Sequence, residues 1–257
     1  MVPAPIEGQL PGTWQELETT VGRILAESGY DVEVQKNVKL ARGDVDVDVW
    51  ADDHSSPPNV IAVECKRWKA AVPKHVVHAF RQVVGDSGSN TGLIVSAAGF
   101  QDGAIEAAAY SNVRLMDWDG FQSMFVARWI QRFMAPELRR EADPLMEYTE
   151  PLNSRIFRKA DALDEQHQQR FIELRQRHFS LGMGFLRLLA EPFASPQSTG
   201  GLASLELPLR RTMVDDYVSQ FSAAVLDADA LRPLLEALTT AYREAIAEFD
   251  EVFGGRA

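Results

Sequence analysis

Acidic side chains and one lysine fall on two predicted strands that follow each other along the chain. In residues 44–50 (DVDVDVW) the aspartates share one face and the valines the other, because side chains alternate along an extended chain. Residues 60–66 (VIAVECK) predict a largely buried strand, on which Glu64 and Lys66 share a face and Cys65 points into packing. If the strands are neighbours, an aspartate, a glutamate and a lysine converge on one place.

Such a group suits a hard divalent cation. Mg²⁺ prefers oxygen ligands, usually takes only one or two carboxylates, and keeps water on its other positions. Asp48 and Glu64 can supply the carboxylates, and the backbone carbonyl of Cys65 is a third candidate ligand. The metal would lower the pKa of a bound water and neutralise charge on a phosphodiester. Lys66 would orient or deprotonate that water, or stabilise the transition state.

A local basic stretch follows the second strand. Residues 65–85 contain no acidic residue, and their basic residues are Lys66, Arg67, Lys69, Lys74 and Arg81. Such a patch attracts a phosphate backbone even though the whole chain, with 26 basic and 37 acidic residues, has a net charge of −11. We therefore expect DNA contacts from Arg67, Lys69, Lys74 and Arg81. An ordinary solvated surface is the alternative.

The elements that must position these residues alternate between helix and strand over the first 135 or so residues. Apolar residues at helical spacing predict helices at residues 14–28, 74–85, 101–110 and 120–134. Alternating or continuous apolar runs predict strands at residues 30–36, 44–50, 60–66, 91–96 and 113–116. This αβββαβαβα order indicates an α/β fold with a mixed sheet flanked by helices, whose later strands are parallel.

The rest of the chain is predicted to be all-α. Residues 155–191 have a helical pattern with a break near Gly182 and Gly184, residues 193–203 are typical of a loop, and the C-terminal residues form an amphipathic helix. The predicted organisation is a domain at residues 1–140, a proline-containing linker at 141–154 and a helical module at 155–257.

Composition narrows the class of protein. The 257 residues are 46% hydrophobic and 25% charged, which excludes a disordered chain. Cys65 is the only cysteine, so the chain has no internal disulfide and no cysteine-based zinc site. No apolar run approaches the ~20 residues that span a bilayer, and residues 1–10 lack the features of a signal peptide. We expect a cytoplasmic protein without membrane contact.

An ordered series of segments resembles a known family. After an early helix that carries Glu18, the segments are residues 43–51 (GDVDVDVWA), 63–67 (VECKR), 92–96 (GLIVS), 99–104 (GFQDGA) and 115–120 (LMDWDG). Over about residues 13–125, the chain resembles the Mrr-type restriction endonuclease domain of the PD-(D/E)xK nuclease superfamily.

The resemblance implies a metal-binding aspartate and an acid-x-lysine strand on an α/β core. Glu64 and Lys66 match that strand directly, and Glu18 matches a helix glutamate that completes the site in some members. Asp48 fits the aspartate best, because two apolar residues and an alanine follow it. Asp46, on the same face, is the alternative metal ligand, and the proline of the superfamily's name is absent.

The function implied is a Mg²⁺-dependent DNA endonuclease, with Mn²⁺ able to substitute, in bacterial defence against foreign DNA. Cutting both strands of a duplex usually needs two active sites, which favours a homodimer or higher oligomer. The helical module would serve oligomerisation, sensing or the binding of a protein partner. The alternatives are a catalytically silent nuclease-fold module that binds DNA or signals, and an interaction subunit of a larger defence complex.

Overall fold

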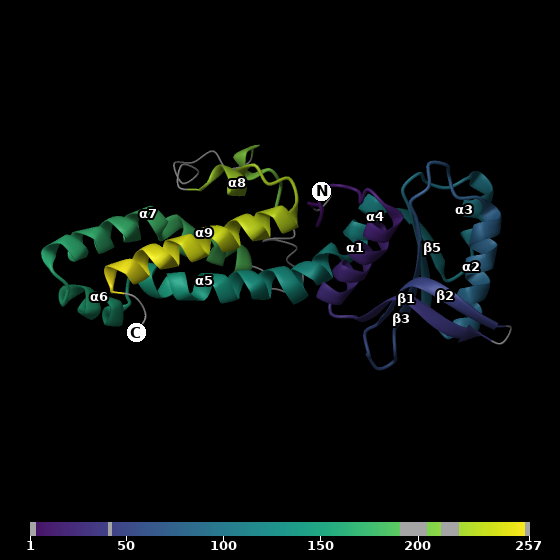
Figure 1. The fold of residues 1–257 in the computed structure, drawn as a ribbon, viewed down its shortest axis with the longest axis horizontal. Coiled ribbons are helices and arrows are strands. Elements are labelled where there is room, and N and C mark those ends of the chain that lie inside the picture. The colour runs from purple at the N-terminus through teal and green to yellow at the C-terminus, as the bar shows by residue number, and fades with distance from the viewer. Residues whose placement is uncertain (1–3, 41–42, 191–204, 212–220, 255–257) are drawn as a thin grey trace. The chain divides into compact units, whose positions relative to one another are not determined.

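The computed structural model describes residues 4–40, 43–190, 205–211 and 221–254 (Figure 1). The chain divides into two compact units, one of residues Gln9–Phe133 and one that joins residues up to Gly8 to the chain from Met134 onward. None of the helices in the described ranges has the length and apolar character that crossing a membrane requires.

The unit of residues 9–133 is built on a five-stranded mixed sheet with the strand order β1-β2-β3-β4-β5. β1 (Asp31–Leu40), β2 (Gly43–Asp52) and β3 (Val60–Lys66) are antiparallel neighbours. β4 (Thr91–Ser96) and β5 (Val113–Asp117) continue the sheet parallel to β3, as predicted. Parallel neighbours need crossover connections, and helices supply them here.

Helices cover both faces of this sheet (Figure 1). α1 (Trp14–Glu27) and α4 (Trp118–Trp129) lie on one face, and α2 (Lys74–Ser87) and α3 (Asp102–Ala108) lie on the other. Val77 and Phe80 of α2 belong to a buried cluster with Ala62 and Ile94 of the sheet. The element order confirms the predicted α/β fold, αβββαβαβα.

The start of α1 is closed by reciprocal hydrogen bonds. The Thr13 side chain accepts the Glu16 N–H at 3.2 Å, and the Glu16 carboxylate accepts the Thr13 N–H at 3.2 Å. This capping box satisfies two backbone donors that the helix itself cannot pair. The register that it sets directs Leu17 and Val21 into the core and also buries Glu18.

The β1–β2 hairpin reverses its faces along its length. Val34 lies against α1, because a Cβ atom on Gly22 would be 2.9 Å from its Cγ2 atom, whereas Val38 lies in the cluster beneath α2 and α3. In a regular strand these two side chains would share a face. Gln35 lies between them with φ of 56°, in the left-handed region, and the reversal occurs there.

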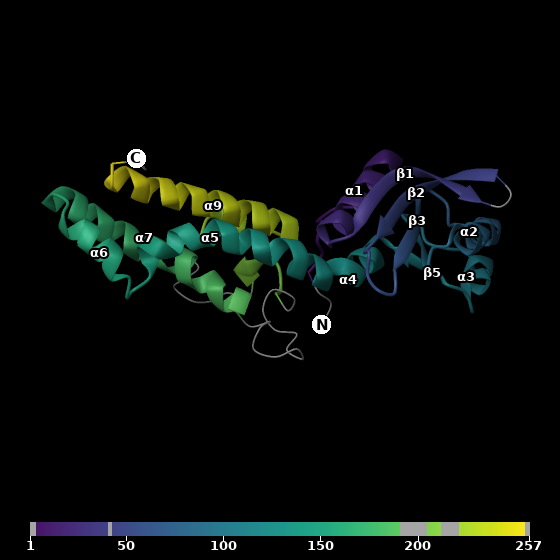
Figure 2. The same ribbon diagram turned by 90° about the horizontal axis from the view of Figure 1, so that it is seen from below.

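The second unit forms helices in its described residues. They are α5 (Ala135–Thr149), α6 (Ser154–Asp161), α7 (Glu165–Ala190), α8 (Ala223–Leu226) and α9 (Leu231–Val252), with a 3₁₀ turn at Leu209–Arg211. A π-helical turn at Ile130–Met134 precedes α5 in the chain and spans the boundary between the two units. α5, α7 and α9 pack together (Figure 2). Tyr148 of α5 stacks on Phe249 of α9, with ring centroids 4.6 Å apart.

The predicted linker at residues 141–154 differs from the structure. Residues 141–149 continue α5, with Pro144 inside the helix. Ala142 and Leu145 are buried, and this burial offsets the backbone hydrogen bond that the proline removes.

The predicted break in the long helix is also absent, because α7 continues through Gly182. A Cβ atom there would be 2.3 Å from the Thr149 hydroxyl oxygen, so this glycine serves the close approach of α5 and α7. The predicted loop at residues 193–203 lies outside the described residues.

Candidate active site

Asp48 lies at the point where β2 separates from β3. The pairing of β2 with β3 covers Val49 to Asp52. At residue 48 the side chain replaces the backbone as the hydrogen-bond acceptor. The Oδ2 atom of Asp48 accepts a hydrogen bond from the backbone N–H of Cys65 at 2.7 Å. One strand therefore holds the carboxylate beside the residues of its neighbour.

Glu64 and Lys66 lie on the same face of β3 and bind each other. The Nζ atom of Lys66 donates a hydrogen bond to Oε1 of Glu64, and the side chains of Lys66 and Glu64 are only 14% and 22% exposed, respectively. Burial and the charge of Asp48 raise the pKa of Glu64 against the opposing effect of Lys66. Two carboxylates are thus held together in a poorly solvated place, a condition that a cation relieves.

A third carboxylate comes from α1. Glu18 is 5% exposed, and its Oε2 atom accepts a hydrogen bond from Gln35 Nε2 at 2.7 Å. The same Nε2 atom lies 3.4 Å from Oδ1 of Asp48. Burial raises the pKa of Glu18, and the hydrogen bond from Gln35 partly opposes that shift. The structure therefore brings together side chains from α1, β1, β2 and β3.

Two neighbours complete the surroundings of Lys66. Its Nζ atom lies 5.5 Å from the centroid of the Trp68 ring, and Trp68 is 43% exposed. Cys65 points to the opposite side and is buried, which raises the pKa of its thiol well above the ordinary value. This thiol stays protonated and acts as a packing group.

Asp46 is directed elsewhere. Its Oδ1 atom accepts a hydrogen bond from Nδ2 of Asn37, its cross-strand neighbour, at 2.8 Å. Asp48, by contrast, acts on the pKa of both Glu18 and Glu64. The geometry favours Asp48 over Asp46 as the aspartate of the site.

Two of the four predicted DNA-binding residues have structural partners. Arg67 donates from Nε to the carbonyl oxygen of Pro11 at 2.7 Å, and Arg81 donates from Nη1 to the carbonyl oxygen of Ala107 at 2.8 Å. The second bond pairs a carbonyl in the last turn of α3. The other two residues, Lys69 and Lys74, are exposed.

Sequence reasoning missed Gln35. It predicted a strand over residues 30–36 but assigned no role to the polar side chain at position 35. Neither its left-handed backbone nor its approach to a helix 17 residues earlier in the chain has a signature in the local pattern.

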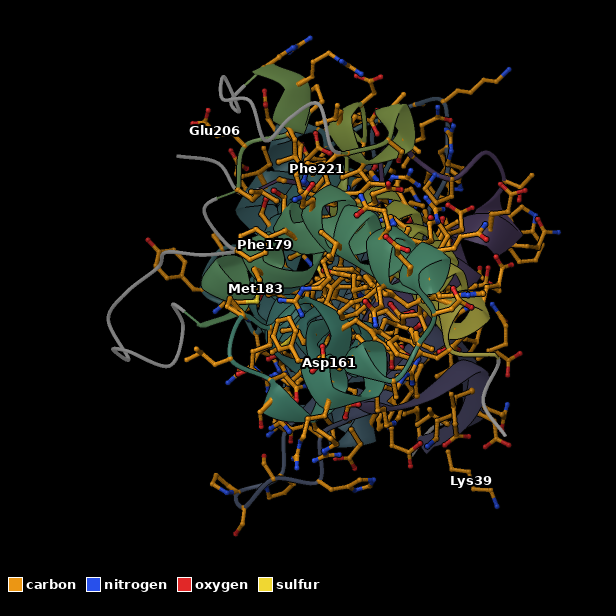
Figure 3. All side chains as sticks on the ribbon, turned by 90° about the vertical axis from the view of Figure 1, so that its left-hand side faces the viewer. Lys39, Asp161, Phe179, Met183, Glu206 and Phe221 are labelled. Carbon is orange, nitrogen blue, oxygen red and sulfur yellow. The ribbon has the colours of Figure 1, made fainter. Side chains whose placement is uncertain are left out.

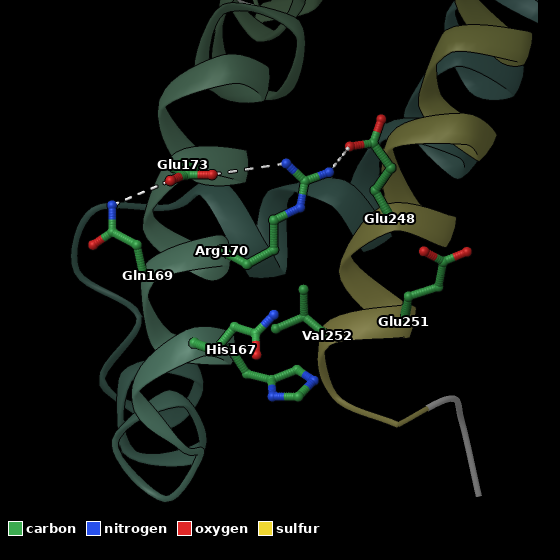
Figure 4. A pocket seen from close by; sticks show the side chains of 8 residues that line it. His167, Gln169, Arg170, Glu173, Glu248, Glu251 and Val252 are labelled. Carbon is green, nitrogen blue, oxygen red and sulfur yellow. Dashed lines mark hydrogen bonds and ion pairs between the residues drawn. The ribbon is translucent and has the colours of Figure 1, made fainter.

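A separate polar groove lies between α7 and α9 (Figure 4). Its charges pair with one another: Arg170 contacts Glu248 at 3.1 Å and Glu173 at 3.8 Å. Arg177 contacts Glu248 as well, at 2.9 Å. This groove joins two helices through ion pairs and lies outside the carboxylate group described above.

The donor set around Asp48 is compatible with a divalent metal. In the part of the chain that the structure describes, no cluster of three or more His, Cys, Asp or Glu side chains forms a ready metal cage. Mg²⁺ does not need one, since it binds through one or two carboxylates and water. Asp48 and Glu64 supply two carboxylates, and the charge of Asp48 contributes to the raised pKa of Glu64.

Comparison with known proteins finds one family model that matches part of the chain. Residues 12–125 match a family model, Mrr_cat, described as "Restriction endonuclease". No significant match is found among curated proteins. Similar solved structures include the protein of unknown function AF1548, which is 14% identical and covers 95% of this chain and 100% of its own, with a TM-score of 0.39.

Two endonucleases are also similar in structure. A repair endonuclease from Pyrococcus abyssi is 17% identical over 44% of this chain and 50% of its own, with a TM-score of 0.32. MspJI restriction endonuclease, solved with a 27-mer oligonucleotide, is 23% identical over 47% of this chain and 29% of its own, with a TM-score of 0.31. The chain thus spans half or less of the length of these two enzymes.

Proposed function

We propose that this protein is a metal-dependent endonuclease that hydrolyses phosphodiester bonds in DNA, and the match of residues 12–125 to a family model described as "Restriction endonuclease" supports this proposal. One observation carries the proposal. Three elements that are separate in the sequence, α1, β2 and β3, bring Glu18, Asp48, Glu64 and Lys66 into one interacting group. Burying several charges costs several kcal/mol unless they are compensated, and catalysis is a reason to retain them.

In this proposal Asp48 and Glu64 would hold the metal ion, Mg²⁺ with Mn²⁺ as a substitute, and the Cys65 carbonyl would be a further ligand. When bound, the metal lowers the pKa of a water molecule and offsets the charge of the scissile phosphate. The hydrogen bond from the backbone N–H of Cys65 fixes the orientation of the Asp48 carboxylate. Glu18, on α1, adds a third carboxylate to the group.

Lys66 is the cationic group of the proposed reaction. Its ammonium is a compact charge with three donors, and its contact with Glu64 places it beside the carboxylates. From there it orients the attacking water and stabilises negative charge that develops on the phosphate. The Nζ atom also lies over the Trp68 ring, 5.5 Å from its centroid, in the range of a cation–π contact.

We propose that DNA is bound mainly through Lys69 and Lys74, whose side chains are exposed near the end of β3 and at the start of α2. Arg67 and Arg81 contribute positive charge. Their main role is structural, because their guanidinium groups donate hydrogen bonds to the carbonyl oxygens of Pro11 and Ala107. Phosphate contacts of this kind supply affinity without sequence specificity.

Defence against foreign DNA in the cytoplasm, and action as a homodimer or higher oligomer, are further parts of the proposal. Cutting a duplex usually requires two active sites. On α7 the apolar residues Ile172 and Phe179 are 48% and 41% exposed, and Phe179 lies beside Met183 (Figure 3). Such side chains are available for burial by a second copy or by a protein partner.

The experiment that tests the proposal incubates the purified protein with supercoiled plasmid, linear duplex and single-stranded DNA. Each substrate is tested with Mg²⁺, with Mn²⁺ and with a chelator. We expect metal-dependent cleavage that falls by roughly 100-fold or more in Glu64→Gln. The matched control is Asp44→Asn, an exposed carboxylate on β2, which should cleave at the parental rate.

A folded Glu64→Gln protein that cuts as fast as the parent would contradict the assignment of the site. If the parent cuts nothing under any condition, calorimetry with Mg²⁺ and Mn²⁺ separates the alternatives. Heat of binding that is lost in Asp48→Asn would support a metal site, whereas no heat would favour a silent module that binds DNA or signals.

A further inference from the structure

Gln35 has an unusual backbone conformation for a residue inside a strand. Its φ is 56°, in the left-handed region that glycine, and to a lesser extent asparagine, adopts at low cost. A strained non-glycine residue persists only where the surrounding structure over-determines it, and such residues concentrate at functional sites. We therefore expect the side chain of Gln35 to make contacts that favour glutamine at this strained position.

The face reversal of the hairpin explains the backbone but not the side chain. Val34 and Val38 face opposite sides of the sheet, and a left-handed residue between them produces the reversal. Glycine would serve that purpose without strain. Gln35 is exposed, so its side chain is not retained for packing in the core.

The side chain of Gln35 does contact the site. Its Nε2 atom donates to Oε2 of Glu18 at 2.7 Å and lies 3.4 Å from Oδ1 of Asp48. An amide nitrogen carries two hydrogens, so one group can serve two acceptors. The amide is also uncharged, and so it joins two carboxylates without supplying a positive charge that would compete with a cation.

We infer that Gln35 is a positioning residue, which holds Glu18 and Asp48 in their relative orientation from the neighbouring strand. The inference rests on the proposed function, because the orientation matters only if these carboxylates act together. It goes beyond that function by assigning a task to a residue outside the acid-x-lysine pattern and by explaining why a strained position carries glutamine.

The test compares Gln35→Gly and Gln35→Asn with the parent. Gln35→Gly relieves the strain and removes the amide, so we expect the thermal midpoint to rise by roughly 2–4 °C while kcat falls by about tenfold and KM for DNA stays the same. Gln35→Asn tolerates the left-handed backbone and keeps an amide, so kcat should recover in part. A protein that becomes more stable but less active is not expected from a purely structural residue.

Asn37→Ala is the matched control. Asn37 lies two residues further along β1, and its amide also binds an aspartate across the hairpin, Asp46, at 2.8 Å. This pair lies outside the proposed site, so the variant should keep the parental kcat. Equal losses of kcat in Gln35→Gly and Asn37→Ala would overturn the inference, as would parental kcat in Gln35→Gly.

A second readout does not depend on cleavage. The backbone N–H of Cys65 is bonded to Asp48 Oδ2, so its hydrogen exchange reports how well Asp48 is held. We expect exchange at Cys65 to become about tenfold faster in Gln35→Gly and to be unchanged in Asn37→Ala. If the parent protein is not a nuclease, the proposed function fails, and the Cys65 exchange rate still decides whether Gln35 positions Asp48. An unchanged rate in Gln35→Gly would overturn the inference.

Discussion

The carboxylate of Asp48 accepts the backbone N–H of Cys65 at 2.7 Å, at the residue where β2 leaves β3. The backbone pairing of β2 with β3 ends at Val49. The side chain of Asp48 then provides the next hydrogen bond between the two strands. The consequence is a fixed carboxylate near Glu64, whose pKa is raised by burial and, in addition, by the charge of Asp48. Separating strands expose the position to ligands, while the hydrogen bond to Cys65 preserves the orientation of Asp48.

Divalent metal should stabilise the folded protein through these carboxylates. At a free Mg²⁺ or Mn²⁺ concentration of about 100 times Kd, the expected gain in unfolding free energy is about 2.7 kcal/mol. Thermal unfolding with and without metal measures it. Asp44→Asn should retain the gain, and Asp48→Asn should lose it. A full gain in Asp48→Asn would exclude that residue as a ligand.

Gly22 should be required for the position of α1. A Cβ atom at this residue would be 2.9 Å from Cγ2 of Val34, so the substitution must displace either the Val34 side chain or the helix that carries Glu18. We expect Gly22→Ala to lower the unfolding free energy by about 1–2 kcal/mol and to reduce cleavage. Denaturant unfolding and cleavage assays measure both effects.

Gly85→Ala is the control for this substitution, because Gly85 lies in α2 and a Cβ atom added to it would meet nothing within 4 Å. It should raise the unfolding free energy by up to about 1 kcal/mol, as helix propensity predicts, and should not affect cleavage. If both alanine variants behave alike, close packing at Gly22 does not control the site.

Acid should weaken the attachment of α4 to the sheet. Arg128 donates to the Ser28 carbonyl at 2.7 Å and to Asp53 Oδ2 at 3.4 Å. Hydrogen bonds from Ser55, and further ones from Asn59 and Arg128, lower the pKa of Asp53 below its ordinary value of 3.8. A depressed folded-state pKa contributes stability above the unfolded-state pKa, and this contribution is lost as the pH falls.

The corresponding variant is Asp53→Asn. We expect it to be less stable than the parent by about 1 kcal/mol at pH 7, with a difference that begins to shrink below roughly pH 5 and continues to shrink as the pH falls toward the depressed folded-state pKa. Chemical unfolding at several pH values measures the trend. Asp86→Asn, an exposed change on α2, is the control. A difference that is constant with pH would show that the Asp53 charge is not responsible.

DNA affinity should depend on Lys69 and Lys74 in a way that salt reveals. Each phosphate contact changes the slope of log K against log salt concentration by about 0.9. In a Glu64→Gln background, which prevents cleavage, Lys69→Ala and Lys74→Ala should each reduce the slope by about that amount. Fluorescence anisotropy with labelled duplex at several salt concentrations measures it.

Arg81→Ala gives the contrasting result. Its guanidinium pairs the Ala107 carbonyl, so the variant should lose about 1 kcal/mol of unfolding free energy with a smaller change in the salt slope. An unchanged slope in both lysine variants would place the DNA contacts on another surface.

The sequence by itself determined the features that depend on local periodicity. Alternation in residues 44–50 and the apolar run in residues 60–66 predicted the two strands that carry Asp48, Glu64 and Lys66. The order of apolar patterns predicted the α/β fold, which the structure confirms. These patterns can be read directly because the faces of a helix or strand repeat every few residues.

The tertiary structure decided the features that depend on contacts between distant residues. The sequence favours Asp48 and leaves Asp46 as the alternative, and only the tertiary structure bonds Asp48 to the Cys65 N–H and Asp46 to Asn37. The sequence predicts Arg81 as a DNA contact, and only the packing of α2 against α3 gives its guanidinium a hydrogen bond to the Ala107 carbonyl as well.

Gln35 shows the same limit most clearly. Its left-handed φ and its hydrogen bond to Glu18 exist only when α1 lies against the β1–β2 hairpin. Local propensity disfavours that backbone conformation for glutamine, and long-range packing overrides it. Such a position is invisible in a linear pattern, because the contacts that stabilise it form between residues far apart in the chain.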